Sequence, residues 1–196
     1  MIINFRQIIV LFKSITIFEI VLTSVVAVAL GVAFWGWTFI YELVKPLLRI
    51  GGLSYLISGF WIFPSIFLSQ IIRKPGIALV ASVLAAFVES LLTHWGLMSL
   101  LWGVAQGAGA ELVFICFAYN KWDLKVLIIA SIFSAILSYL LDYYIYDYHQ
   151  MSVFFNTIQL LSYLISASLL AGVLSAKLSK RLLRLGILDQ FLIAKN

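Results

Sequence analysis

Four acidic residues lie within or beside long apolar stretches of this sequence. Glu19, Glu89 and Glu111 fall inside such stretches, and Asp142 falls close to the end of another. A charged side chain at the centre of a membrane-spanning helix costs roughly 3 kcal/mol to insert, so each acid marks a candidate functional site. No Lys or Arg lies in the interior of any span predicted below. We therefore expect these acids to be protonated, to be paired with hydrogen-bond donors, or to bind a cation.

Polar and small residues recur at helical spacing around these acids. Residues three or four positions apart share one face of a helix. The stripes are Ser82, Ala85, Glu89 and Thr93; Ser131, Ser134, Ser138 and Asp142; Asn156, Gln159, Ser162 and Ser166; and Ser99, Gly103, Gln106 and Ala110, with Trp102 one turn before Gln106. Such stripes can hold helices together through hydrogen bonds and close packing, and we favour that interpretation for the serines. For Glu89, Glu111 and Gln106 we favour a ligand site.

The composition excludes a water-soluble globular domain. The chain has 196 residues, of which 64% are apolar and 11% charged, whereas a globular domain is about half apolar and about a quarter charged. So much apolar surface cannot fit inside a core of this size, and much of it must face lipid. A spanning helix needs roughly 20 mostly apolar residues. Six such spans are predicted, in one all-α membrane domain covering residues 1–196: about 14–34, 51–71, 76–94, 97–119, 124–146 and 153–176.

The positions of Lys and Arg predict the orientation of these spans. Cytoplasmic loops of membrane proteins carry an excess of Lys and Arg. With both termini in the cytoplasm, only Lys45 and Arg49 among the 13 Lys and Arg fall on the outside. Glu19 then lies in the inner part of the first span, where it packs between helices or contacts a partner protein. The formal charge of +5 comes from short basic clusters between apolar stretches, so we expect no nucleic-acid partner.

An aromatic segment at 35–49 connects the first two spans on the outside. It contains Trp35, Trp37 and Tyr41, and it is too long for a tight turn. One interpretation is an aromatic belt, because Trp and Tyr collect where a membrane meets water. The other is a lid over an outward-facing pocket, on a flexible tether with hinges at Gly36 and at Gly51-Gly52. The two interpretations are compatible.

Motifs for catalysis and for metal binding are missing from the sequence. It has no phosphate-binding Gly-Lys-Ser/Thr loop and no Gly-x-Ser-x-Gly elbow. His94 and His149 fall in different loops, and Cys116 is the single cysteine. We therefore expect no enzymatic activity, no cofactor and no metal site. A binding or translocating subunit without its own motor is the class that remains.

An ordered series of short motifs gives the sequence a family resemblance. The series is Arg73-Lys74-Pro75-Gly76, Trp95-Gly96, Gln106-Gly107 and Ala110-Glu111-Leu112-Val113-Phe114. On these motifs, the sequence resembles the YkoE type of substrate-binding (S) component of energy-coupling factor (ECF) vitamin importers. The likeness covers most of the chain, and residues 73–119 are its specific part. The family pattern often has a glycine where this chain has Thr93-His94.

The resemblance implies a fold, a substrate and partners. It implies a six-helix fold in the bacterial cytoplasmic membrane that captures thiamine, or its hydroxymethylpyrimidine (HMP) moiety, from outside. It also implies a transmembrane coupling (T) subunit and two cytoplasmic ATPase subunits. Related S components dock their first helix on the T subunit through small residues. By that likeness, Ala27 and Gly31 are predicted to form the docking face. The alternative is that these small residues pack against another helix of the same chain.

The chemistry of thiamine agrees with the acids independently. Its thiazolium ring is a permanent cation, which suits a buried carboxylate without a basic partner, and faces of Trp and Tyr suit both of its rings. HMP lacks the cation, so the acids favour thiamine. The predicted substrate-binding residues are Trp61, Glu89, His94, Trp95, Trp102, Gln106, Glu111, Asp142, Tyr143, Asn156 and Gln159, with Trp35, Trp37 and Tyr41 as the lid.

Two alternatives of other classes remain open at this point. A stand-alone proton- or cation-coupled carrier of a small organic cation would use Glu89, Glu111 and Asp142 as a relay. A membrane protein with a purely structural or assembly role would use none of them for a ligand.

Overall fold

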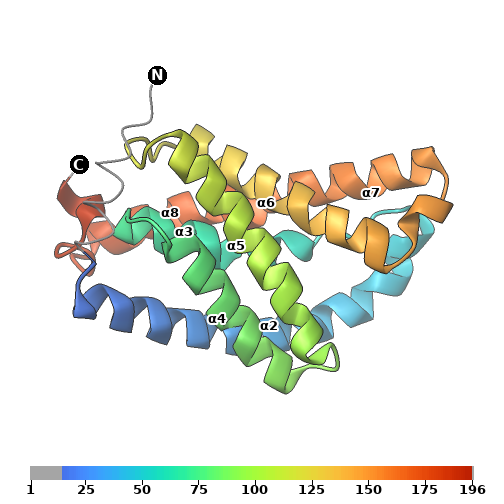
Figure 1. Ribbon diagram of the computed structural model, residues 1–196, viewed down its shortest axis with the longest axis horizontal. Coiled ribbons are helices and arrows are strands. Elements are labelled where there is room, and N and C mark those ends of the chain that lie inside the picture. Colours follow the sequence, from blue (N-terminus) through green and yellow to red (C-terminus); the bar gives the residue numbers. More distant parts are fainter. Residues whose placement is uncertain (1–14, 196) are drawn as a thin grey trace.

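Six helices form one elongated bundle in the computed structural model, which describes residues 15–195 (Figure 1). The helices are α2 (Ile17–Ile50), η1 (Ser58–Ile62) continuing into α3 (Phe63–Ile72), α4 (Ile77–Leu92), η2 (Gly96–Met98) continuing into α5 (Ser99–Cys116), α6 (Leu124–Ile145), and α7 (Val153–Ser166), which continues through the π-helical η4 (Ala167–Val173) into α8 (Leu174–Arg184). The short helices η3 (Tyr148–Gln150) and η5 (Leu192–Lys195) lie in the connection before α7 and near the end of the chain.

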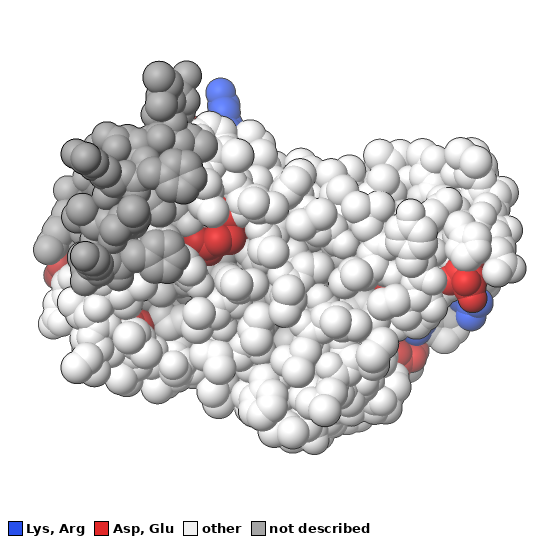
Figure 2. All heavy atoms as spheres, viewed as in Figure 1, with Lys and Arg blue, Asp and Glu red and all other residues white. Residues whose placement is uncertain are grey.

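The helices have the length and surface of membrane spans. Four are long and apolar enough to cross a membrane: Ile17–Ile50, Gly96–Cys116, Leu124–Ile145 and Val153–Arg184. The other two, Ser58–Ile72 and Ile77–Leu92, are apolar but shorter. Large apolar side chains face outward, such as Leu43, which is 79% exposed. On the face shown in Figure 2, most of the surface formed by the described residues is uncharged. The prediction of an all-α polytopic membrane protein is confirmed.

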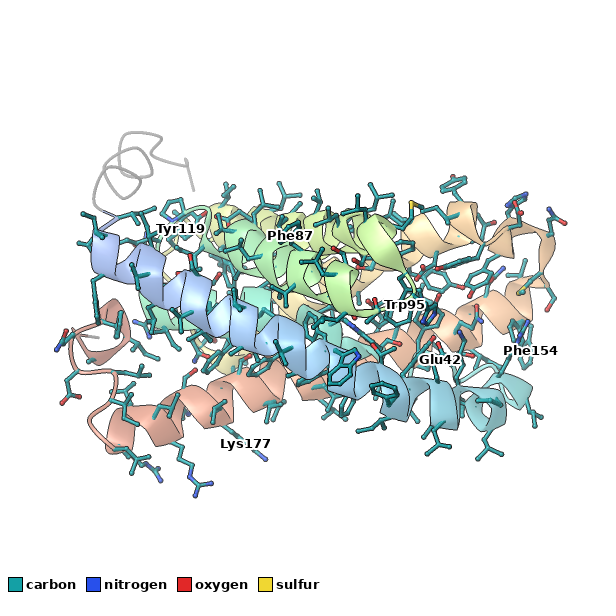
Figure 3. The ribbon with its side chains drawn as sticks, turned by 90° about the horizontal axis from the view of Figure 1, so that it is seen from below. Glu42, Phe87, Trp95, Tyr119, Phe154 and Lys177 are labelled. Atoms are coloured by element: carbon teal, nitrogen blue, oxygen red, sulfur yellow. The ribbon has the colours of Figure 1, made fainter. Side chains whose placement is uncertain are left out.

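The connections between helices define two ends of the bundle. The terminal end holds the start of α2, the end of α8, and the α3–α4 and α5–α6 connections (Figure 1). The cavity end, named for the cavity described below, holds the α2–η1, α4–α5 and α6–α7 connections. In Figure 3, Tyr119 lies at the terminal end, whereas Trp95, Glu42 and Phe154 lie toward the cavity end.

Small residues let α4 and α5 approach each other closely. A Cβ atom on Gly103 of α5 would lie 2.6 Å from the Cβ of Ala86 on α4, and one on Gly107 would lie 2.7 Å from the Cα of Leu79. No side chain larger than hydrogen fits at either position without movement of α4. Within a membrane, such close van der Waals contact is a main source of helix association. The two helices, which both form walls of the cavity, are therefore held in a fixed relation.

The first helix is longer than the sequence predicted. The predicted span stopped at residue 34 and left 35–49 as a separate outside segment, whereas α2 continues without a break to Ile50. Its 34 residues make a helix about 51 Å long, which exceeds the roughly 30 Å thickness of a bilayer's hydrocarbon core. The aromatic segment is therefore a helical wall, and the flexible tether hinged at Gly36 is wrong.

Local chemistry explains where α2 ends. A glycine in a helix interior costs only about 1 kcal/mol relative to alanine, so Gly36 does not stop the helix. Trp37 is anchored beyond it, because its indole N–H donates a hydrogen bond to the Ile57 carbonyl oxygen at 3.1 Å. The chain turns only at Gly51-Gly52, where Gly52 has a φ of 72°, a left-handed conformation that favours glycine.

The last helix also extends beyond its predicted span. That span ended at residue 176, but the helix continues to Arg184. On its inner face, the Ser179 hydroxyl donates a hydrogen bond to the Gln70 side chain of α3 at 3.0 Å. This contact keeps the basic end of the helix packed on the bundle, while side chains such as Lys177 point away from it (Figure 3).

Two glycines of α2 test how the helices pack. A Cβ on Gly31 would lie 2.6 Å from the Ala85 carbonyl oxygen of α4, whereas a Cβ on Gly36 would meet nothing within 4 Å. We expect Gly31→Ala to lower the melting temperature of the detergent-purified protein, because the backbone of α4 must shift. Gly36→Ala should leave it unchanged or raise it, since alanine is favoured by about 1 kcal/mol in a helix. Thermal unfolding measures both, and equal effects would contradict the packing.

Candidate substrate-binding site

A cavity of about 930 Å³ lies between the helices at the cavity end. Small-molecule sites measure about 300–1,000 Å³, so it has room for a ligand with two rings. Its walls come from α2, η1, α4, α5, α6 and α7 and from the connections beside them. The polar and aromatic side chains that line it include Tyr41, Lys45, Arg49, Tyr55, Trp61, Glu89, Trp95, Ser99, Trp102, Gln106, Asp142, Tyr146, Tyr148, Ser152, Gln159 and Tyr163.

Glu89 of α4 forms an acidic corner of the cavity among aromatic rings. The residue is 3% exposed, and its carboxylate accepts a hydrogen bond from the Trp61 indole N–H at 2.6 Å. The Trp61 ring meets Tyr41 edge to face with centroids 5.2 Å apart, and it meets Trp95 with centroids 5.7 Å apart. All four residues line the cavity. A carboxylate beside several aromatic faces is suited to an organic cation.

Asp142 of α6 forms a second corner with the same pattern. The residue is 4% exposed, and its carboxylate accepts a hydrogen bond from the Trp102 indole N–H at 2.8 Å. The Trp102 ring stacks on Tyr146 with centroids 6.0 Å apart. Neither Asp142 nor Glu89 has an ion-pair partner among residues 15–195. The described part of the protein therefore supplies no counter-ion for either carboxyl group.

Two amides add groups that can both donate and accept hydrogen bonds. Gln106 of α5 is 5% exposed and Gln159 of α7 is 3% exposed, and both line the cavity. The Tyr139 hydroxyl donates to the Gln159 side-chain oxygen at 3.2 Å and so orients that amide. Amides can pair with the edge of a nitrogen heterocycle, which also carries donors and acceptors. The cavity thus combines charge, ring faces and hydrogen-bonding groups.

Comparisons with known proteins identify the family. The protein-family model described as "ABC-type cobalt transport system, permease component" matches residues 18–137. The "Putative HMP/thiamine permease protein YkoE" of Bacillus subtilis (strain 168) is 34% identical over 186 residues, which cover 94% of this chain and 92% of that protein. A solved structure, "Crystal structure of an S-component of ECF transporter", matches with a TM-score of 0.87 at 33% identity, covering 93% of this chain and 92% of that one. The chain belongs to the YkoE-type S components of ECF transporters.

Membership of this family fixes the general role of the molecule. An S component is a non-enzymatic, multi-pass binding subunit in the bacterial membrane, and it works with a T subunit and ATPase subunits. The resemblance drawn from the motifs between residues 73 and 119 is confirmed. Of the functional classes considered from the sequence, the family therefore supports a binding subunit of a transporter, and not a stand-alone carrier or a purely structural protein.

The cavity of the S component brings together many of the predicted substrate-binding residues. Those that line it are Trp61, Glu89, Trp95, Trp102, Gln106, Asp142 and Gln159. They come from η1, α4, α5, α6 and α7 and from the α4–α5 connection, so no single stretch of sequence contains the site.

Three other predicted residues stand beside the cavity without lining it. The Asn156 amide donates a hydrogen bond to the Tyr148 carbonyl oxygen at 2.8 Å, which joins α7 to the preceding connection. The exposed His94 ring lies 5.0 Å from the ring of Trp95, and Tyr143 is half-buried on α6.

Glu111 lies away from the cavity, and its prediction as a ligand residue is corrected. Its carboxylate accepts the backbone N–H groups of Gly76 at 2.5 Å and of Ala78 at 3.1 Å, and also the Tyr119 hydroxyl. N–H groups at the start of a helix have no partner inside it, and the helix dipole favours a carboxylate there. Glu111 therefore caps α4 at the terminal end. The sequence held a signal, because Glu111 points about 140° away from Gln106 on one helix.

Glu19 also has a structural partner within the chain. Its carboxylate lies 2.6 Å from the Lys74 ammonium nitrogen, and both side chains are buried. It accepts the Thr16 backbone N–H at 2.7 Å as part of a capping box at the start of α2. Lys74 lies in the α3–α4 connection, so a base from outside the spans neutralises an acid inside one. Of the two roles predicted for Glu19, the structure supports helix packing.

Only one of the three predicted lid residues lines the cavity. That residue is Tyr41. Trp37 is turned toward the α2–η1 connection by its hydrogen bond, and Trp35 is 43% exposed and packs edge to face on Phe39 with centroids 5.2 Å apart. Positions 35 and 37 lie about 200° apart on a helix, so they cannot face the same side. A covering role for Tyr41 remains a prediction.

The predicted docking pair faces inward and is corrected as well. Ala27 is 0% exposed, and Gly31 is pressed against the backbone of α4. A partner helix cannot reach either residue. The exposed small residues of the same helix are Ala29, Ala33 and Gly36, which lie on another face.

Sequence reasoning missed two kinds of lining residue. Lys45 and Arg49 were read as outside charges, although their spacing of four places them on one face of the extended helix. Tyr55 and Tyr148 come from connections between helices, and nothing in their spacing marks them.

We expect Glu111→Ala to destabilise the S component without changing ligand affinity in the folded fraction. The substitution leaves buried backbone N–H groups without an acceptor, at about 1–3 kcal/mol each. Thermal unfolding and a ligand titration on the same preparation measure the two quantities. Glu89→Gln is the matched variant, and it should reduce affinity with less effect on stability. A large loss of affinity in Glu111→Ala at unchanged stability would contradict the capping role.

Proposed function

We propose that this S component captures thiamine, or its hydroxymethylpyrimidine moiety, in the cavity around Glu89 and Asp142. The observation that carries the proposal is this pair of buried carboxylates, which face one cavity and have no ion-pair partner among the described residues. A buried charge without a partner is unfavourable by several kcal/mol, and an organic cation in the cavity offsets that cost. The Bacillus subtilis relative, named for HMP and thiamine, supports the same substrate class.

Each corner of the cavity suits one ring of thiamine. In this proposal, the thiazolium lies beside Glu89 among the faces of Trp61 and Tyr41, where a desolvated cation–π contact contributes about 2 kcal/mol. The aminopyrimidine stacks on Trp102, and its edge pairs with Asp142 and Gln106. Free HMP would fill only the second corner. Two acidic corners in one cavity therefore favour thiamine over HMP.

The orientation of the S component follows from its charges. We place the cavity end outside and both termini in the cytoplasm, because this arrangement leaves only Lys45 and Arg49 of the 13 Lys and Arg outside. Thiamine then enters from outside, and the energy for its passage comes from the ATPase subunits through the T subunit. Ala29, Ala33 and Gly36 are small, exposed residues of α2 that a T-subunit helix can reach.

We expect the purified protein to bind thiamine without ATP and with a change in Trp fluorescence, since Trp61, Trp95 and Trp102 line the cavity. Glu89→Gln and Asp142→Asn should each weaken thiamine binding by about tenfold or more, because the first removes the charge that faces the thiazolium and the second removes a charged hydrogen-bond acceptor for the aminopyrimidine edge. Glu89→Gln should reduce the affinity of the protein for HMP less than its affinity for thiamine.

Asp123→Asn is the matched control, because this exposed acid lies outside the cavity. Isothermal titration calorimetry or fluorescence titration gives the affinities. Thiamine affinity that stays unchanged in the double variant Glu89→Gln, Asp142→Asn would rule out the proposed cation capture.

A second experiment tests the docking face. We expect Ala29→Trp to block thiamine uptake by cells that carry the whole transporter, while the isolated protein still binds thiamine. Val28→Trp introduces the same side chain on a neighbouring exposed face and serves as the control. Ala27→Trp should instead reduce the yield of folded protein, because Ala27 is fully buried. Normal uptake in Ala29→Trp would show that the T subunit docks elsewhere.

A further inference from the structure

Two basic side chains line the same cavity as the two acids. Lys45 and Arg49 lie on the last turns of α2, four residues apart and hence on one face of the helix. They are also the two bases that depart from the charge bias of the chain in the orientation placed above. Both exceptions to that bias therefore lie in the wall of the cavity.

The protein itself leaves these bases largely uncompensated. The Arg49 guanidinium forms no ion pair or hydrogen bond with any residue that the structure describes. Lys45 lies 3.6 Å from the Glu42 carboxylate, at a partly exposed site, and 5.0 Å from the centre of the Tyr41 ring. Partly exposed pairs of this kind contribute little, about 0–1 kcal/mol. Both cations are therefore available to an anion in the cavity.

Hydroxyl groups from the α6–α7 connection line the cavity with them. Tyr148 and the Ser152 hydroxyl both belong to its wall. Burial raises the pKa of the Tyr148 hydroxyl, and the positive charge of Arg49 acts against that rise. The phenol therefore stays protonated at neutral pH and can donate a hydrogen bond near the guanidinium.

The charges of the cavity match a ligand that carries both signs. A ligand that is only a cation uses Glu89 and Asp142 and leaves Lys45 and Arg49 without a partner. We propose that Lys45 and Arg49 form an anion subsite for a phosphate ester of the cationic ligand, so that the S component accepts thiamine phosphate as well as thiamine. This inference rests on the proposed function, because it places the vitamin moiety in the acidic corners.

The chemistry of the two bases suits a phosphate group. A guanidinium presents a planar fork of N–H donors that binds two phosphate oxygens at once, and an ammonium adds a point charge. The cavity volume of about 930 Å³ lies near the upper end of the range for small-molecule sites, which leaves room for the ester beyond the two rings. If Lys45 and Arg49 served only as anchors at the membrane surface, a phosphate group on the ligand would not increase its affinity.

The test compares thiamine with thiamine monophosphate on the purified full-length protein by isothermal titration calorimetry. We expect the wild type to bind the ester at least as tightly as thiamine. Arg49→Gln should weaken binding of the ester by about tenfold relative to binding of thiamine, as expected for loss of a charge-assisted contact. Arg184→Gln is the matched control, because this exposed arginine of α8 lies outside the cavity.

Glu42→Gln gives an effect of opposite sign. It removes the carboxylate that competes for Lys45, so it should tighten binding of the ester and leave thiamine unchanged. Lys45→Gln is the second variant if Arg49→Gln does not yield folded protein. HMP and HMP phosphate, measured in parallel, show whether the subsite requires the thiazolium ring, and a gain from phosphate in either pair supports the subsite.

The outcomes separate this inference from the proposed function. An ester that binds more than about tenfold more weakly than thiamine to the wild type, with Arg49→Gln altering both ligands alike, overturns the anion subsite while thiamine capture stands. Failure of thiamine, HMP and both esters to bind the folded wild type overturns the proposed function itself.

Discussion

A carboxylate inside a membrane protein must find a positive or hydrogen-donating partner, because lipid offers none. The acids of this bundle meet that requirement in two ways. Glu19 pairs with Lys74, and Glu111 accepts the free N–H groups that begin α4, so the protein itself compensates both. Glu89 and Asp142 receive indole N–H groups, which are neutral donors and leave each negative charge without a counter-ion. The first two acids have charged or backbone partners within the protein, whereas the second two have no counter-ion among the described residues.

The two kinds of acid also lie at opposite ends of the bundle. The compensated acids join α2, α4 and α5 through the short α3–α4 connection at the terminal end. Breaking a buried ion pair costs about 3–5 kcal/mol, so these contacts hold the helices in place. The uncompensated acids sit on α4 and α6 at the cavity end. A cation that enters the cavity therefore changes the electrostatic energy of one end while the contacts that fix the helices at the other end persist.

The sequence predicted the helices better than it predicted the roles of the acids. The predicted spans 76–94 and 124–146 correspond to the observed helices α4 and α6 with nearly the same limits. Each of these helices begins at a turn and continues as an apolar run, which the sequence shows directly. Helical spacing in the sequence also identified Trp102 and Gln106 as site residues, and both line the cavity. Glu111 was misjudged because its partner Gly76 lies 35 residues earlier in the chain. Helical spacing reports which residues share a face, but it does not report which other backbone approaches that face.

The length of α2 connects the two surfaces to which we assign roles in the proposed function. Ala27 and Ala29 differ by two positions, or about 200° around a helix, so small-residue spacing alone cannot tell the inner face from the outer one. The choice depends on α4, which occupies the inner face at Gly31. Further along the same helix, Tyr41 lines the cavity. Because α2 is unbroken from Ile17 to Ile50, the exposed small residues and the cavity wall belong to one rigid element. A displacement of Tyr41 must therefore bend the helix or carry its outer face along, and the cavity and that face cannot move independently.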